Sequence, residues 1–494
     1  MPASKGLKVL FFSSLLFLAS VVWAGEDLRR EIDEILYQRV PKEAEFGLRV
    51  IQLLDPTGGS YGPAGKVLYS FHADELFDAA SNTKLFVTSA ALTRLGPDYE
   101  FTTRVYARGK IEKGVLTGDV ILVGGGDPNI SGRFYKGDAL AIPRKWARAV
   151  RASGIKKITG SIIADDRFFD RAYINPHWPM QDLPYWYAAE ISALSFNDNC
   201  LKLVVTPVKA ERAWATVLKS PPTSYVEIKE SPRVVAEGTA TVNVYRIAGT
   251  NEVRVSGEIP DASRPISLWV SVHNPPLYLA TVLKEELKRA GVKVDGKVRL
   301  VDANEEIDYA RLTLITEHKS TLAQSIKIAN KRSQNFYAEQ ILKTLGKEKK
   351  GEGSWPAGIR AAADFLGELG IAPGTYHMVD GSGLADGNRF SPMQITTLLE
   401  LMAAHPHSQV WKESLSQAGL DGTMRSRLRR SPYQGRVLGK TGTAAGVSAL
   451  SGYVHTTSGH TLAFSFLFND FPGSSRPIKA IEDEILQLLV EWQP

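Results

Sequence analysis

Three short polar signatures follow one another along the chain: Ser-Asn-Thr-Lys at 81–84, Ser-Gln-Asn at 333–335 and Lys-Thr-Gly at 440–442. A serine becomes a useful nucleophile only beside a base. A lysine three residues later on a helix lies on the same face, within reach of the hydroxyl. The other two signatures supply groups suited to proton relay and to anion recognition. The combination predicts catalysis by an activated serine.

Ser81 stands where a helix is expected to begin. Apolar residues follow at helical spacing over residues 85–95, and a Gly-Pro pair ends the pattern. The start of a helix presents backbone N–H groups to a developing oxyanion. The same Ser-x-x-Lys spacing occurs at 153–156, but there it lies in a polar connection. This context favours Ser81 as the nucleophile and Lys84 as its base.

Both ends of the chain combine strand patterns with helical stripes. The expected strands cover residues 46–54, 66–71, 436–442, 449–455 and 461–469, with a turn at 56–59. The expected helices cover residues 321–330, 334–345, 357–369, 393–404 and 478–492. We therefore expect an α+β multidomain fold whose main antiparallel sheet is built from both chain ends and flanked by helices.

The middle of the chain carries shorter strand patterns, and we expect it to form β-rich inserted domains. At 494 residues the chain is too long for one ordinary core, and about 150 residues per domain suggests roughly three. We expect a catalytic domain at 25–98 and 311–494. Inserted domain II is expected at 99–131 and 216–310, and inserted domain III at 132–215.

Residues 1–24 have the pattern of a secretory signal peptide. Lys5 and Lys8 precede an apolar run, and Val22 and Ala24 occupy cleavage-site positions. We expect cleavage and export to the periplasm or another extracytoplasmic space. The alternative is an uncleaved anchor, although the run is shorter than a spanning helix.

Composition is ordinary for a folded enzyme, with 44% hydrophobic and 23% charged residues. The formal charge of +6 is small for this length and does not indicate nucleic-acid binding. It is compatible with loose association with an anionic envelope or with a mixed solvated surface. The single cysteine, Cys200, excludes an internal disulfide and is expected to be a buried thiol.

With its three signatures in this order, the chain resembles the penicillin-binding serine D-Ala-D-Ala carboxypeptidases, specifically class C, whose inserts lie between the first two signatures. Further matches are Gly-Asp-Pro at 126–128, the segment 192–199, Asp-Gly-Ser-Gly-Leu at 380–384 and Asp-Gly-Thr-Met at 421–424. One departure follows Leu384, where Ala-Asp replaces the Ser-Arg that is common in the family. The resemblance implies a penicillin-binding, β-lactamase-like catalytic domain.

The resemblance also implies roles for the site residues. Ser81 attacks the terminal peptide bond of a D-Ala-D-Ala stem and forms an acyl-enzyme, which water then cleaves. Lys84 must lose its charge near neutral pH, which requires its pKa to fall by about 3 units. Burial and a nearby cation, Lys440, are expected to cause this shift.

The remaining residues are expected to bind substrate. Ser333 relays a proton toward the leaving amine and Asn335 bonds the substrate amide. Lys440, with the hydroxyls of Thr441 and Thr443, holds the terminal carboxylate. Gly442 keeps the strand edge open to the ligand. The oxyanion hole is expected at the backbone N–H groups of Ser81 and Thr443.

The expected partners are peptidoglycan D-Ala-D-Ala stem peptides, with β-lactam antibiotics as covalent inhibitors. No cofactor or metal is expected, and the oligomeric state is open. DD-endopeptidase activity is a further possibility, because it also cuts after D-alanine. The alternatives are a β-lactamase, which would need rapid deacylation, and a noncatalytic peptidoglycan-binding protein.

Overall fold

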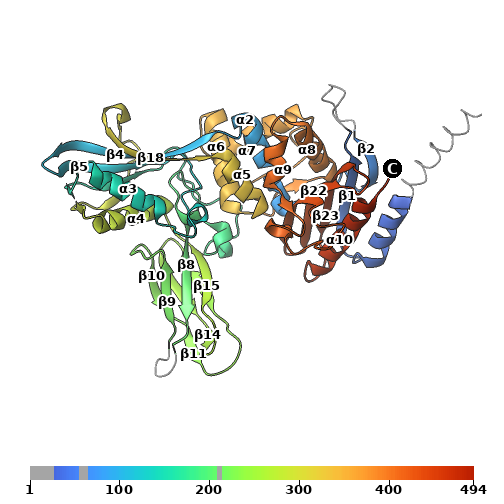
Figure 1. The fold of residues 1–494 in the computed structure, drawn as a ribbon, viewed down its shortest axis with the longest axis horizontal. Helices are drawn as coiled ribbons and strands as arrows, with labels where there is room; N and C mark the ends of the chain where they lie inside the picture. The colour runs from blue at the N-terminus through green and yellow to red at the C-terminus, as the bar shows by residue number, and fades with distance from the viewer. Residues whose placement is uncertain (1–26, 55–64, 209–213) are drawn as a thin grey trace, which may run out of the picture.

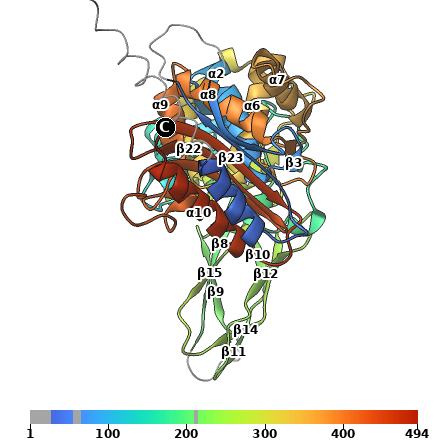
Figure 2. The ribbon, with the colours of Figure 1, turned by 90° about the vertical axis from the view of Figure 1, so that its right-hand side faces the viewer.

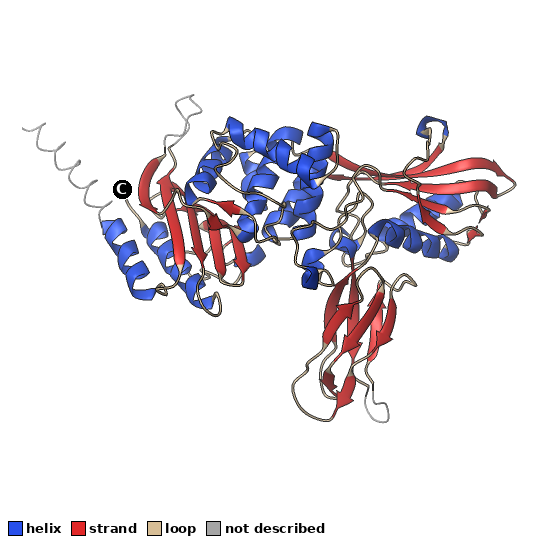
Figure 3. Ribbon diagram, turned by 180° about the vertical axis from the view of Figure 1, so that it is seen from behind, coloured by secondary structure: helices blue, strands red, loops and turns tan. Residues whose placement is uncertain are grey.

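The computed structural model describes residues 27–54, 65–208 and 214–494. Both chain ends form a main body at one end of an elongated molecule, a mixed sheet lies at the other end, and a group of strands projects between them (Figure 1 and, from behind, Figure 3). The expected signal peptide and the 56–59 turn lie outside the described residues. Among the described helices, none is both long and apolar enough to cross a bilayer.

The main body contains a six-stranded antiparallel sheet made from both chain ends, which confirms the expected architecture. The N-terminal part contributes β1 (Glu45–Gln52) and β2 (Lys66–Phe71). The C-terminal part contributes β20 (Ser416–Gln417), β21 (Val437–Ala444), β22 (Val447–His455) and β23 (Thr461–Asn469). The strand order β2-β1-β23-β22-β21-β20 places β1 directly against β23, with β2 at the edge of the sheet.

The central strands of this sheet are buried on both faces. Successive side chains of a strand point to opposite faces, so Ala449 and Tyr453 of β22 face the helical layer while Leu450 and Val454 face the other side. That other side is covered by α10 (Arg476–Glu491) and by the helix at 27–39 (Figure 2). One run of apolar strands therefore supplies two cores.

The helical layer surrounds the segment that carries Ser81. It consists of α2 (Thr83–Leu95), α5 (Leu322–Lys331), α6 (Asn335–Lys350), α7 (Trp355–Glu368), α8 (Pro392–Ala404) and α9 (Ser408–Ser414). The first ten residues of α2 are buried, and this helix packs against α5, α6 and α7. A helix that is buried all round belongs in the interior, so the start of α2 is held rigidly.

The mixed sheet of the insert joins strands from four separate stretches of chain. Its strands are β4 (Glu100–Glu112), β5 (Val115–Val123), β6 (Lys157–Ile158), β7 (Ile162–Asp165), β16 (Lys293–Val294), β17 (Val298–Leu300) and β18 (Thr313–Thr321). Two helices, α3 (Ala141–Ala152) and α4 (Pro275–Arg289), share a core with it.

The projecting strands occupy residues 200–271. A three-stranded sheet contains β8 (Cys200–Thr206), β9 (Thr216–Ser220) and β15 (Ile266–Ser271). Beside it lie β10 (Glu227–Glu230), β11 (Arg233–Val235), β12 (Asn243–Arg246), β13 (Glu252–Ser256) and β14 (Glu258–Pro260).

This pairing corrects the expected grouping of the inserts. Residues 141–165 were placed with domain III, but β6 and β7 are strands of the mixed sheet and α3 packs in the same core. Strands β9–β14 were placed with domain II, but they lie with β8 among the projecting strands. The physical reason is that β5 pairs in parallel with β6 and β7. Parallel neighbours require a crossover connection, which α3 provides. Likewise β18, expected in the catalytic domain, pairs with β4.

Candidate active site

Ser81 lies in a tight 3-10 turn, Ala80–Asn82, immediately before α2. Asp78 Oδ1 accepts a hydrogen bond from the Ala80 N–H at 2.7 Å, and Ala80 has a left-handed φ of 41°. Strand β21 passes directly beside this turn. A Cβ at Gly442 would lie 3.0 Å from the Ala79 carbonyl oxygen, so the glycine allows this close approach.

Lys84 is completely buried, and its side chain reaches back to Ser81. Its Nζ lies 2.8 Å from Ser81 Oγ, 2.7 Å from Asn335 Oδ1 and 2.6 Å from the Ser382 carbonyl oxygen. The structure therefore brings together the first and second signatures at the lysine. The third partner, Ser382, was matched to the family from sequence but was not predicted as a site residue.

Burial lowers the pKa of Lys84 to about 7, while the carboxylates of Asp380 and Glu339 oppose this shift. The direction agrees with the requirement for a neutral base. We expected burial and Lys440 together to lower the pKa of Lys84, whereas desolvation of its ammonium group is the dominant cause. Repulsion between the two lysines is instead a secondary cause of the lowered pKa of Lys440.

Asn335 is held by groups of the protein at both ends of its carboxamide. Oδ1 accepts from Lys84, and Nδ2 donates to the Tyr187 carbonyl at 2.8 Å. The Tyr187 contact fixes which end of the amide faces the lysine. Because each end can form one more hydrogen bond, the expected contact with a substrate amide stays a prediction.

Lys440 forms a second set of contacts with the motif at 333–335. Its Nζ donates to Ser333 Oγ at 2.8 Å and to the Thr441 carbonyl at 2.6 Å. Burial lowers the pKa of Lys440 well below its usual range, and the charge of Lys84 lowers it further. A buried amine in contact with a hydroxyl is suited to proton relay.

The two threonines of β21 lie on the more exposed face of the strand. Thr441 Oγ1 donates to Thr423 Oγ1 at 2.7 Å. Thr443 is exposed and lies two residues further on, so it shares the face of Thr441. Lys440 and Gly442 alternate with them and are buried. The carboxylate-binding role of both threonines stays a prediction.

Comparison with known proteins identifies the family. A model of the D-Ala-D-Ala carboxypeptidase 3 (S13) family matches residues 30–491. The chain belongs to this family. The D-alanyl-D-alanine carboxypeptidase of Actinomadura sp. (strain R39) is 34% identical over 479 residues, which cover 94% of this chain and 85% of that protein. The chain is therefore a hydrolase of the D-Ala-D-Ala carboxypeptidase type.

Solved structures support the same fold. The crystal structure of penicillin binding protein 4 from Haemophilus influenzae has a TM-score of 0.79 and 23% identity, covering 93% of this chain and 99% of that one. Its complex with a novel β-lactam has a TM-score of 0.73 and 21% identity with the same coverage. These matches confirm the α+β architecture of a multidomain penicillin-binding protein for the S13 enzyme.

Several residues that contact the predicted site residues were not themselves predicted as site residues. The buried carboxyl groups of Glu339 and Asp380 lie behind Lys84, and Asp198 accepts from Gln334 Nε2 at 2.9 Å. Glu339 had a detectable signal, because it follows Asn335 by four residues and so lies on the same helix face as the second signature. The Tyr187 contact uses a backbone carbonyl, which leaves no signal in residue type.

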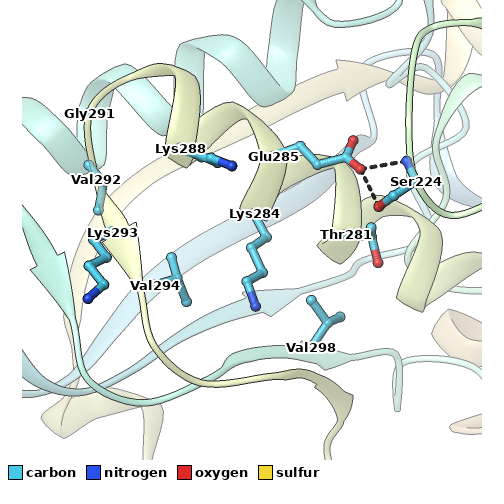
Figure 4. A pocket seen from close by; sticks show the side chains of 10 residues that line it. All are labelled: Ser224, Thr281, Lys284, Glu285, Lys288, Gly291, Val292, Lys293, Val294 and Val298. Atoms are coloured by element: carbon cyan, nitrogen blue, oxygen red, sulfur yellow. Dashed lines mark hydrogen bonds between the residues drawn. The ribbon is translucent and has the colours of Figure 1, made fainter.

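A separate pocket of about 720 Å³ lies on the insert of the enzyme, between α4 and the strands β16 and β17 (Figure 4). Glu285 lies at its rim and accepts from the backbone N–H and the hydroxyl of Ser224, both at 2.7 Å. Lys284 donates to the Gly296 carbonyl at 2.7 Å. The residues of the three signatures do not line this pocket.

Proposed function

We propose that the enzyme cleaves the terminal D-Ala-D-Ala bond of peptidoglycan stem peptides through an acyl-enzyme on Ser81. The observation that carries the proposal is the set of contacts around Lys84. When Lys84 is neutral, its two N–H groups donate to Asn335 Oδ1 and to the Ser382 carbonyl, which can only accept. The lone pair of the amine then faces the Ser81 hydroxyl at 2.8 Å.

The reaction follows from this arrangement. Lys84 takes the Ser81 proton while Oγ bonds to the carbonyl carbon of the scissile peptide. The tetrahedral intermediate breaks its C–N bond, and the leaving amine of D-alanine receives a proton through Ser333. The ester on Ser81 is then hydrolysed by water, which regenerates the hydroxyl and releases the shortened stem.

Substrate recognition is assigned to the third signature. The terminal carboxylate of the stem is placed against Lys440, Thr441 and Thr443. An anion at this position favours the protonated form of Lys440, so binding would restore a charge that burial suppresses in the free enzyme. Substrate binding would thereby protonate Lys440, which contacts Ser333, and a proton would then be available for the leaving group.

The proposal includes three broader features. Endopeptidase action is included because a cross-linked peptide presents the same bond with a larger leaving group. β-Lactams are proposed as covalent inhibitors, and the β-lactam complex of the Haemophilus influenzae relative supports this. Export after removal of residues 1–24 would place the enzyme beside its substrate, with loose attachment to an anionic envelope.

The test is the Ser81→Ala variant, whose labelling by a fluorescent penicillin should fall by roughly a thousandfold or more, because no other group replaces the nucleophile. Release of D-alanine from a stem pentapeptide should stop as well, with similar thermal unfolding. Ser153→Ala is the matched control, since Ser153 begins the unrelated Ser-x-x-Lys sequence. Undiminished labelling of Ser81→Ala would refute the assignment. Rapid nitrocefin turnover by the wild type would favour a β-lactamase instead.

A further inference from the structure

The buried face of α6 carries three polar residues spaced four apart: Asn335, Glu339 and Lys343. Asn335 is 9% exposed and the other two are fully buried. Residues four apart lie on one face of a helix, so Glu339 is one turn beyond the residue that contacts Lys84. A carboxyl group in such a position is unfavourable unless it is hydrogen-bonded. Its partners therefore indicate what it does.

Glu339 accepts hydrogen bonds from the Gly381 N–H and the Trp355 indole, and the Ser382 side chain is a further hydrogen-bonding partner that lowers its pKa. Its Oε1 and Oε2 lie 3.1 Å and 3.0 Å from the Gly381 N–H, and Oε2 also accepts from Trp355 Nε1 at 2.7 Å. Burial, together with the neighbouring Asp380 carboxylate, raises the pKa of Glu339 to about 7. The Gly381 contact ties α6 to the loop at 380–385.

That loop lies directly against the nucleophile's turn. The Asp380 carboxylate holds the loop together by accepting hydrogen bonds from the N–H groups of Gly383 at 2.7 Å and Ala385 at 2.9 Å. Gly383 has φ 74°, and a Cβ there would lie 1.8 Å from the Ala80 carbonyl oxygen. Between these anchors, the Ser382 carbonyl accepts from Lys84 Nζ at 2.6 Å.

We propose that Glu339 is a positioning residue of the catalytic centre, which holds the Ser382 carbonyl against Lys84 through the Gly381 amide. The inference rests on the proposed function of Ser81 and Lys84. Helix α6 thereby fixes both acceptors of the amine, one directly through Asn335 and the other through Glu339. If the Ser382 carbonyl moves, the amine can rotate and its lone pair no longer faces Ser81.

The Glu339→Gln variant tests this inference. A carboxamide replaces one carboxylate oxygen with an NH2 group, which only donates. Because both oxygens of Glu339 accept from the Gly381 N–H, this NH2 group faces that N–H whichever oxygen it replaces. We expect the rate constant of acylation by a fluorescent penicillin to fall roughly tenfold to a hundredfold, because small displacements of a catalytic group have effects of this size. The dissociation constant of the noncovalent complex should change little.

A second variant distinguishes positioning from general damage. In Glu339→Gln/Trp355→Phe the indole N–H no longer fixes the orientation of the carboxamide, so the glutamine can turn its oxygen toward the Gly381 N–H and its NH2 group away from it. This double variant should recover most of the lost acylation rate. Trp355→Phe and Lys343→Met are matched controls at buried positions, and both should acylate within about twofold of the wild-type rate.

The outcomes separate this inference from the proposed function. If wild-type protein is not acylated at Ser81, the proposed function fails. If wild-type protein is acylated and Glu339→Gln reacts equally fast, only the role of Glu339 is overturned. A double variant that stays as slow as Glu339→Gln would also overturn it, because restoring the Gly381 contact would then have no effect. If Glu339→Gln does not fold, the double variant decides the question, and the inference requires it to be acylated at close to the wild-type rate.

Discussion

At the scale of single residues, the chemistry depends on a lysine that is both buried and fully hydrogen-bonded. The lowering of the Lys84 pKa to about 7 means that the charged amine is destabilised, relative to an ordinary lysine in water, by on the order of 5 kcal/mol. The carboxylates of Asp380 and Glu339 act against this destabilisation, yet desolvation outweighs them. Lys84 of the free enzyme is therefore charged and neutral in similar amounts near pH 7, and under the proposed function only the neutral form is an active base.

Acylation of Ser81 should accordingly increase as pH rises through about 7. Lys84 accepts a proton only when it is neutral, and the neutral fraction grows as pH rises above its pKa. The measurement is the rate constant of penicillin acylation between pH 5 and 10, with circular dichroism at each pH to show that the fold persists. A midpoint near 10 would mean that the amine keeps its ordinary pKa and would contradict the assignment.

At the scale of elements, the second signature is held by the segment 166–199 of the insert. Ser333 has a left-handed φ of 54°, which is uncommon outside glycine and is unfavourable by about 1–3 kcal/mol. The next residue, Gln334, donates to Asp198, which also binds Arg133. These contacts hold the turn at Ser333 in place between α5 and α6.

Gln334→Ala should therefore lower the acylation rate by about tenfold, since the backbone at Ser333 can relax toward a more favourable conformation. The effect should appear in the acylation rate constant and leave the thermal unfolding midpoint nearly unchanged. Gln409→Ala, which replaces a glutamine of α9 that donates to Glu413 at the surface, is the control. Equal rates for both variants and the wild type would show that Ser333 needs no such support.

The sequence predicted the elements that carry hydrophobic periodicity better than the contacts between them. The strand at 461–469 was expected with the bounds that β23 has, and α5, α7 and α8 lie within two residues of their expected bounds, whereas α9 was not expected. The contact between Tyr187 and Asn335 was not predictable, because any residue type supplies a backbone carbonyl. Glu339 was missed because no short motif contains it.

At the scale of the whole molecule, the main body and the inserts have separate hydrophobic cores. This separation explains why the main sheet was predicted correctly and the grouping of the inserts was not. The sheet of the main body was predictable because its strands are long, apolar and close to the chain ends. The inserts were grouped wrongly because their sheet depends on pairs distant in sequence, such as β4 with β18. Local patterns do not encode such pairing. The segment 166–199, however, contributes Trp178, Ala188 and Ile191 to the main-body core.

This arrangement predicts that the inserts and the main body respond separately to destabilisation. Ile485 of α10 and Ile259 of β14 are both fully buried, the first in the core beneath the main sheet and the second in the core of the inserts. An Ile→Ala substitution in a core lowers the free energy of unfolding by about 2–5 kcal/mol. Multidomain proteins need not unfold in one transition, so each substitution should act on its own part.

In a urea titration, Ile485→Ala should shift the loss of penicillin labelling to lower urea, because Ser81 and β21 meet only while the main sheet is intact. Ile259→Ala should leave the urea midpoint of labelling nearly unchanged. It should instead shift a separate unfolding transition of the inserts, measured by circular dichroism. The residues that hold Gln334 and Asn335 lie in 166–199 rather than in the projecting strands, which is why labelling should survive the second substitution. Equal shifts of labelling in both variants would instead mean that the whole chain unfolds as one cooperative unit.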